Sequence, residues 1–243
     1  MGGKPVLSGS AGAGIAAGRA AFYDLLVAVF RHLPDRDLVM RIEKGDFQKF
    51  FARCCELQNG RLNSGLDLLN SYQAGIRGRP EGEVLTELSV DRTKMLRGTG
   101  HEDLKPPYEG LYMRKKSMGD SVLEVRRSYR KAGLMPDETV HESPDYLCVE
   151  LDFMKQLCLR EQNQWLHDGR IKETIAQEEE FLREHLGTWL GDFCRAVGKH
   201  GLTDFYKGFS LILDAFVFMD QAWLAEVIDQ IDSKGVSKDH ESY

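Results

Sequence analysis

The sequence predicts an all-α protein, because apolar residues recur at helical spacing along most of the chain and no segment alternates as a strand would. The chain has 243 residues, of which 42% are hydrophobic. That length can bury a sizeable core, as one domain or as two closely packed halves. Proline and glycine fall between the periodic segments, where they end helices.

The first part of the chain predicts a series of amphipathic helices. The earliest runs from Arg19 to His32 and ends before Pro34, which cannot continue it. Four more are expected at 35–57 with a break at Gly45, at 62–76, at 83–96 and at 122–132, where Gly133 stops the last.

The second part predicts three longer helices, at 146–165, 171–197 and 203–231. The first two keep an apolar stripe of helical period over several turns. The third offers Thr203 and Asp204 as caps, and its middle is apolar on nearly every side, as in a buried core helix.

These segments suggest a division of the chain. We expect a flexible Gly/Ala-rich leader over 1–18, an N-terminal helical half over 19–133, a connecting loop over 134–145, a C-terminal helical half over 146–233 and a polar tail over 234–243. The stretch 98–121 is too long for a simple connector, and long loops in compact domains often carry function.

Composition excludes several classes of protein. A formal net charge of −6 argues against a general nucleic-acid binder and favours a cationic partner segment. Five cysteines without a C-x-x-C pair suggest neither a disulfide framework nor a zinc site, and the adjacent Cys54 and Cys55 are interpreted as packing residues. The most apolar run, 209–219, is interrupted by Asp214 and is too short to span a membrane. We therefore expect a cytoplasmic protein.

No motif of a catalytic, metal or cofactor site is visible. The glycines of 12–18 lack the strand and spacing of a dinucleotide loop. Arg126-Arg127 resembles an export signal but lies mid-chain with no apolar region behind it, so a solvated helix face is the better interpretation. The seven histidines show no paired spacing, and neither a nucleophile elbow nor a phosphate loop occurs. The sequence predicts a protein that is not an enzyme and holds neither metal nor cofactor.

The segment Glu142-Ser143-Pro144-Asp145-Tyr146 is the most informative stretch of the chain. Pro144 keeps Ser143 out of the helical region, and Asp145 is then placed to cap a helix beginning at Tyr146. The loop therefore ends one element, starts another and presents carboxylates at the junction.

Four segments, taken in order and spacing, resemble motifs of the TorD/DmsD/NarJ family of cytoplasmic chaperones, which mature molybdenum-containing oxidoreductases. They are Arg92–Gly98, Pro107–Gly110, Glu142–Tyr146 and His185–Trp189. Two departures stand out, because Arg92 replaces an aromatic residue of the family pattern and Tyr146 replaces a histidine. The resemblance covers the chain from about Arg19 to Ile231 and implies a TorD-like helical globule with N- and C-terminal halves.

What the resemblance implies is a chaperone that binds the catalytic subunit of a molybdoenzyme, its twin-arginine leader peptide, or both, before cofactor insertion and export. A leader with two arginines and an apolar stretch needs carboxylates beside a hydrophobic groove. Glu142, Asp145 and Glu109 are the candidate carboxylates. The candidate groove residues are Tyr108, Tyr112, Tyr146, Met95 and Leu96.

Each candidate also has a purely structural interpretation. Asp145 fits an N-cap, Glu142 a solvated loop charge, and Met95 and Leu96 the core. The tyrosines can pack one ring face and leave the hydroxyl for a partner.

Two other functions stay open at this point. One is a nucleotide-binding small-molecule enzyme, since the resemblance implies weak guanine-nucleotide binding, although no phosphate loop is present. The other is an all-α scaffolding or regulatory protein. We expect no stable membrane insertion, because the apolar runs are too short to span a membrane, and a monomer or a domain-swapped dimer.

Overall fold

The computed structural model describes residues 9–54, 59–98, 100–113, 117–136, 141–167 and 171–238, with backbone only at Cys54, Met118 and 232–238. Helices account for most of these residues, and the part described contains no strand beyond one isolated bridge between Tyr108 and Tyr146. The predicted all-α fold is confirmed. The packing roles expected of Cys54 and Cys55 lie outside the described side chains.

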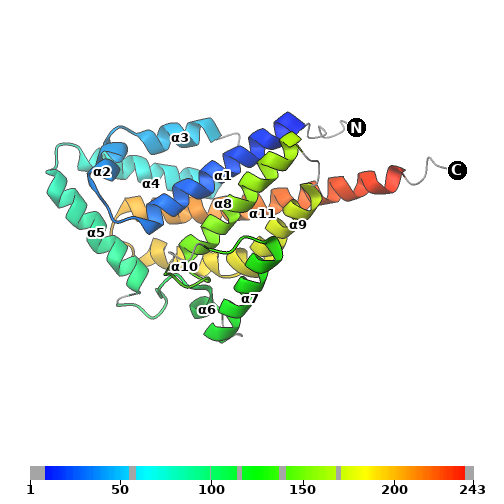
Figure 1. Ribbon diagram of the computed structural model, residues 1–243. Helices are drawn as coiled ribbons and strands as arrows, with labels where there is room; N and C mark the ends of the chain where they lie inside the picture. The colour runs from blue at the N-terminus through cyan, green and yellow to red at the C-terminus, as the bar shows by residue number, and fades with distance from the viewer. Residues whose placement is uncertain are drawn as a thin grey trace.

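The helices follow the predicted order with shifted boundaries (Figure 1). Their bounds are α1 Gly9–Arg31, α2 Arg36–Glu43, α3 Asp46–Cys54, α4 Gly60–Ile76, α5 Glu81–Arg97, α6 Glu109–Tyr112, α7 Met118–Ala132, α8 Leu147–His167, α9 Ile171–Phe181, η1 Leu182–Leu186, α10 Gly187–His200 and α11 Asp204–Lys238. The single helix expected at 171–197 is α9 and α10 joined through the π-helical turn η1.

Local chemistry explains several of the helix ends. Asp35 accepts a hydrogen bond from the Leu38 amide at 2.8 Å and caps α2. Asn59-Gly60, a dipeptide typical of hairpins, instead begins α4, because the Asn59 side chain accepts from the amides of Arg61 and Leu62. The expected breaks at Gly45 and Gly133 have φ of 66° and 65°, a conformation that favours glycine.

Helices from the two halves of the chain pack against each other. α1 lies along α8, α4 lies along α11, and α10 also packs on α11 (Figure 1). α6 contacts α7 and α10, and α7 contacts α9. A single hydrophobic cluster takes residues from both halves, so the N- and C-terminal parts share one core.

Residues 9–18, expected in a flexible leader, instead form the first turns of α1. A Cβ on Gly12 would lie 2.3 Å from the Trp165 ring, so only glycine lets α1 approach α8 this closely. At the other end, α11 continues to Lys238, into the stretch expected as a polar tail.

α1 is long and apolar enough to pass for a membrane span by length and composition, and it lies near the N-terminus. In this fold 61% of its most apolar window is buried inside the protein. Its apolar length is used to build the core against α8.

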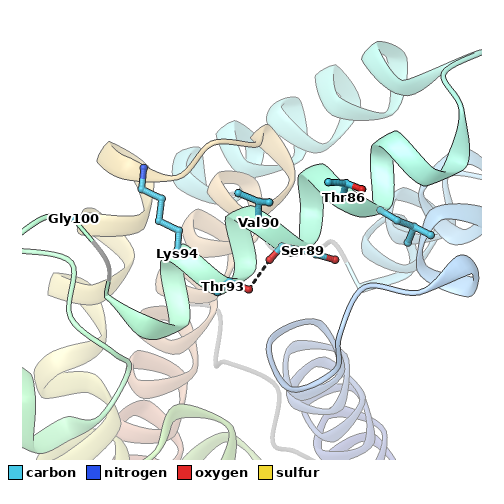
Figure 2. Close-up of a pocket in the computed structure, with 7 residues that line it drawn as sticks. Thr86, Ser89, Val90, Thr93, Lys94 and Gly100 are labelled. Carbon is cyan, nitrogen blue, oxygen red and sulfur yellow. Dashed lines mark hydrogen bonds between the residues drawn. The ribbon is translucent and has the colours of Figure 1, made fainter.

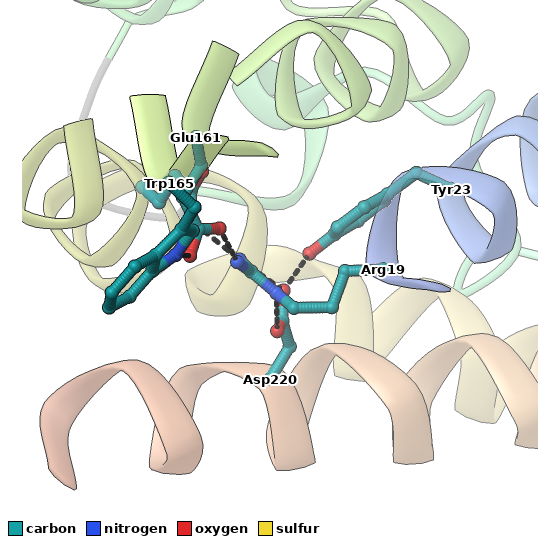
Figure 3. A network of polar contacts seen from close by, with 6 residues as sticks. Arg19, Tyr23, Glu161, Trp165 and Asp220 are labelled. Carbon is teal, nitrogen blue, oxygen red and sulfur yellow. Dashed lines mark hydrogen bonds and ion pairs between the residues drawn. The ribbon is translucent and has the colours of Figure 1, made fainter. Parts of the chain in front are cut away.

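The middle of α1 carries the buried Arg19, which joins four helices (Figure 3). Its guanidinium reaches Asp220 of α11 at 2.5 Å, Glu161 of α8 at 2.5 Å and Glu178 of α9 at 2.6 Å. Tyr23 donates to Asp220 at 2.6 Å. One guanidinium cannot neutralise three carboxylates, and burial raises the pKa of Glu178 to about 8. Burial thus favours the protonated form of Glu178 within this network.

Two adjacent residues of α5 hold the ends of other helices. Asp91 is buried and accepts from the amides of Leu202 and Thr203, both at 2.8 Å, at the start of α11. The Thr203 hydroxyl in turn accepts from the Tyr206 amide, which confirms it as a cap. Arg92 donates to the carbonyls of Phe30 and Arg31 at the end of α1.

Candidate functional site

The two sequence segments singled out for function lie side by side at the start of α6 and of α8. Tyr108 and Tyr146 form the antiparallel bridge. On either side of it the Glu109 amide donates to the Asp145 carbonyl at 2.9 Å, and the Leu147 amide donates to the Pro107 carbonyl at 2.9 Å. The structure therefore brings the two segments together, although Tyr108 and Glu142 are 34 residues apart in the chain. We call the paired segments 107–110 and 142–147 the junction.

Asp145 holds the junction together from inside. It is 1% exposed. One carboxylate oxygen accepts from the Ser143 hydroxyl at 2.5 Å, and the other accepts from the Gly110 amide at 3.2 Å, in the first turn of α6. The cap therefore serves α6 across the junction instead of the helix that follows Asp145, which begins at Leu147. This difference arises because the bridge brings the exposed amides of α6 next to the loop.

Glu142 lies at the outer edge of the junction and is exposed. The Tyr108 hydroxyl donates to its carboxylate at 3.5 Å, the long limit of a hydrogen bond. Burial and the Glu142 charge raise the pKa of Tyr108. Glu142 is thus available to a partner, with a phenol beside it.

Tyr146 stands beneath Tyr108 and is 8% exposed. The two ring centroids are 5.1 Å apart, in a tilted arrangement. Where the family pattern has histidine, this chain thus carries a phenol ring that fills space under Tyr108, and burial raises its pKa.

Tyr112 is half-buried at the end of α6. Its hydroxyl donates to the Lys105 carbonyl at 2.7 Å and accepts from the Lys105 amide at 3.0 Å, which fixes the loop that precedes the junction. The centroid of its ring lies 5.6 Å from that of Trp189 and 6.1 Å from that of Phe193. Tyr112 therefore ties the loop to α10.

Met95 and Leu96, at the end of α5, have core positions. Met95 is 1% exposed, and Leu96 is half-buried against the same cluster. Of the two, Leu96 keeps part of its side chain at the surface.

Glu109 points inward and is fully buried. Its Oε2 lies 3.0 Å from Nδ1 of His185 in η1, and Nε2 of His185 lies 3.0 Å from the Ser128 hydroxyl of α7. Trp189 donates to the buried Glu150 at 3.2 Å. Burial, and then the charge of Glu109, raises the pKa of Glu150 well above its usual value.

The roles of Ser128 and Glu150 were not visible in the sequence. The motif His185–Trp189 was the available signal. In the structure His185, in the π-helical turn, reaches Glu109, and Trp189 reaches Glu150.

Several hollows open on the described surface. One of about 820 Å³ lies along the outer side of α5 and is lined by Leu85, Thr86, Ser89, Val90, Thr93, Lys94 and Gly100 (Figure 2). A second of about 270 Å³ lies beside the junction, because it includes Tyr129, whose hydroxyl donates to the Pro144 carbonyl at 2.8 Å. A third of about 530 Å³ contains Ser128 and His185.

The described side chains do not gather three His, Cys, Asp or Glu residues as a metal ion would need. Cys148, Cys158 and Cys194 are buried free thiols, and burial raises the pKa of all three, that of Cys148 to about 12. That the protein holds no cofactor stays a prediction.

Comparison with known proteins identifies the family. The family model described as nitrate reductase delta subunit matches residues 59–195, more than half of the chain. The chaperone protein TorD of Vibrio vulnificus strain CMCP6 is 26% identical over 211 residues, covering 85% of this chain and 94% of that protein. TorD of Vibrio cholerae El Tor N16961 is 22% identical over 87% of this chain and 94% of its own length. TorD of Shewanella piezotolerans is 23% identical over 85% of this chain and 92% of its own length.

The paired motif segments, the all-α fold and these matches agree, and the chain belongs to the nitrate reductase delta subunit family of TorD/NarJ-type chaperones.

Proposed function

We propose that this protein is a cytoplasmic chaperone dedicated to one molybdopterin-containing oxidoreductase. It binds the apo-enzyme, its twin-arginine leader peptide, or both, before cofactor insertion and export. Family membership and relatives named TorD over most of their length support this function. The junction supports a role for particular residues, because two family motifs meet there and Glu142 lies at the surface.

Glu142 is the proposed reader of a leader arginine. Of the three candidate carboxylates, Glu109 and Asp145 are buried and bonded within the protein, whereas Glu142 is exposed. A guanidinium can bind a carboxylate through two parallel hydrogen bonds, which makes the contact directional as well as electrostatic. Asp145 and Glu109 contribute by holding the junction in shape.

The hollow of about 270 Å³ is the proposed seat for an apolar side chain of the leader. Leu134, Val149 and Phe153 supply apolar surface, and the hollow adjoins the junction through Tyr129. Tyr108 and Tyr112 then contact the peptide with their exposed edges. A site of this kind combines one charged contact with apolar burial.

Replacing Glu142 tests this arrangement. Glu142→Gln removes the charge and keeps the shape, so affinity for a synthetic leader peptide should fall about five- to a hundredfold, the range for a charge-assisted contact. Glu43→Gln, at an exposed position of α2, is the matched control and should bind as the wild type does. Salt should weaken the wild-type complex more than the Glu142→Gln complex. Equal affinities for both variants at low salt would assign the arginines to another surface.

Client binding needs no nucleotide turnover in this proposal. Purified protein should capture the apo-enzyme precursor and show no appreciable guanine-nucleotide hydrolysis. Capture from the native cytoplasm followed by mass spectrometry should recover a molybdoenzyme catalytic subunit. Robust nucleotide hydrolysis by the isolated chain, abolished by one substitution, would contradict the proposal.

A further inference from the structure

Three residues distant in the chain form a linear chain of hydrogen bonds beneath the junction. Glu109 begins α6, Ser128 lies in α7 and His185 lies in η1. Glu109 Oε2 is 3.0 Å from His185 Nδ1, and His185 Nε2 is 3.0 Å from Ser128 Oγ. No motif in the sequence predicts this arrangement of Glu109, His185 and Ser128.

The two ring nitrogens of His185 have different partners. In the tautomer that a serine nucleophile requires, the Nδ1–H of His185 donates a hydrogen bond to the Glu109 carboxylate, and Nε2 accepts one from the Ser128 hydroxyl. An acid that orients a histidine, which in turn faces a serine hydroxyl, is the arrangement that activates serine nucleophiles.

We propose that Ser128 is the nucleophile of an acyl-transfer site that hydrolyses small carboxylic esters, with His185 as the general base and Glu109 as the group that orients it. This activity goes beyond client binding and uses a different opening on the surface.

Access to the serine is provided by the hollow of about 530 Å³. Ser128 and His185 both line it, together with Glu124, Arg127 and Lys131 of α7 and with Glu180 and Glu184 from α9 and η1. Ser128 is half-buried, and His185 is 3% exposed. A small ester can therefore reach the hydroxyl, while the ring behind it is shielded from water.

Stabilisation of the oxyanion must come from a side chain. Ser128 lies inside α7, where backbone amides bond to the preceding turn. Within the part of the chain described, Lys131 is paired with Glu180 at 2.5 Å and Glu184 with Arg183 at 3.0 Å. The Arg127 guanidinium, exposed at the same hollow, is the donor we assign to the developing negative charge.

The reaction balances with water as the second reactant. Ser128 Oγ bonds to the carbonyl carbon while its proton passes to His185 Nε2, and the carbonyl oxygen takes up the negative charge. The bond to the leaving oxygen then breaks, and that oxygen departs as an alcohol with the same proton. Water, deprotonated by Nε2, cleaves the acyl-serine ester, releases a carboxylic acid and restores the hydroxyl.

The π-helical turn is a second observation at this place. Single π-turns within helices are rare and often lie at functional sites. Here the turn spans Leu182–Leu186 and carries the histidine of the chain of hydrogen bonds. A purely structural role, in which His185 only ties α6 to α7, would use the same contacts, so the test must measure reactivity.

The first test is covalent labelling of the full-length protein with a fluorophosphonate. One equivalent should attach to Ser128 by peptide mapping, and p-nitrophenyl acetate should be hydrolysed. Ser128→Ala should remove the adduct and lower the hydrolysis rate at least about tenfold, and alanine suits a helix interior. Ser89→Ala is the matched control, since Ser89 also lies mid-helix at a hollow, one whose described lining contains no histidine (Figure 2). It should react as the wild type does.

A second measurement separates activation from simple exposure. In Ser128→Cys the thiol should be alkylated by iodoacetamide at pH 6.5 at least about fivefold faster than in Ser89→Cys, because a neighbouring imidazole lowers the pKa of a thiol. The wild type gives the background from the natural cysteines. Absence of an adduct on folded wild-type protein, or equal alkylation of the two cysteine variants, would overturn the proposal and leave His185 a structural tie.

Discussion

At the scale of single residues, buried charged side chains in this protein link helices through hydrogen bonds. Asp91 is the clearest case, because both of its oxygens bind the start of α11 and the Thr203 hydroxyl adds a third bond at 2.6 Å. A buried carboxylate of this kind replaces the water that free helix amides would otherwise bind.

Asp91→Ala should therefore destabilise the protein by about 2–4 kcal/mol, since several hydrogen bonds to a charged group are lost and amides are left buried. Urea unfolding followed by circular dichroism measures this change. Asp67→Ala, at an exposed position of α4, is the control and should change stability by less than about 0.5 kcal/mol. Equal effects would show that Asp91 has no special role.

Glu178 predicts a dependence of stability on pH. Its pKa is raised by burial to about 8 in the folded protein, against about 4.5 for a free glutamate. Between these pH values the folded state binds more protons than the unfolded state. The contribution of Glu178 to the free energy of unfolding is therefore largest below about pH 4.5 and falls as the pH rises towards 8.

Glu178→Gln should remove this contribution. The slope of stability against pH between about 5 and 8 should become less negative by up to about 1.4 kcal/mol per pH unit, the amount for one proton. Thermal unfolding across this pH range measures it. Glu173→Gln, an exposed change in the same helix, should leave the slope unchanged. A slope that is the same in the wild type and Glu178→Gln would mean that Glu178 is ionised when folded.

At the scale of elements, close helix contacts depend on glycine at the point of crossing. α4 crosses α11 where Gly65 faces Gly208. A Cβ on Gly65 would lie 2.7 Å from a side-chain carbon of Ile212 and 2.8 Å from the Gly208 carbonyl. The second contact involves backbone, which cannot turn aside as a flexible side chain can.

Gly65→Ala should therefore destabilise the protein by about 1–3 kcal/mol through overpacking. Gly75→Ala lies in the same helix with open space around its Cβ, so it should stabilise by up to about 1 kcal/mol. Chemical unfolding of the two variants side by side is the measurement. A stabilising effect at both positions would show that the crossing adapts freely.

At the scale of the whole molecule, the two halves of the chain depend on each other. α1 packs on α8, α4 packs on α11, and Arg19 binds carboxylates from three later helices. Breaking such a buried network by losing one partner is costly, because charges are left uncompensated.

We expect one cooperative unfolding transition. Helix content by circular dichroism and the environment of tryptophans by fluorescence should change at the same urea concentration. Two separated transitions would instead indicate halves that unfold independently. For the same reason a fragment limited to 146–238 should not fold alone, as its core would lack α1 and α4.

The sequence by itself determined the helical class, most of the helix positions and the family, since these depend on local periodicity, caps and short motifs. Helical spacing placed both ends of α8 and the start of α11 within two residues, and Thr203 was identified as a cap. The segments 107–110 and 142–146 were recognised as related to function, and they meet in the fold.

Only the tertiary structure decided which way the side chains of those segments point. Glu109, Asp145 and Glu142 are chemically alike in the sequence, yet the first faces His185, the second caps α6 and the third faces solvent. The segment 1–18, predicted as a flexible leader, is part of the core from Gly9 onward, because Trp165, some 150 residues later, packs on Gly12. Burial and partner choice arise from contacts between distant segments, and helical periodicity, being a local property, does not encode them.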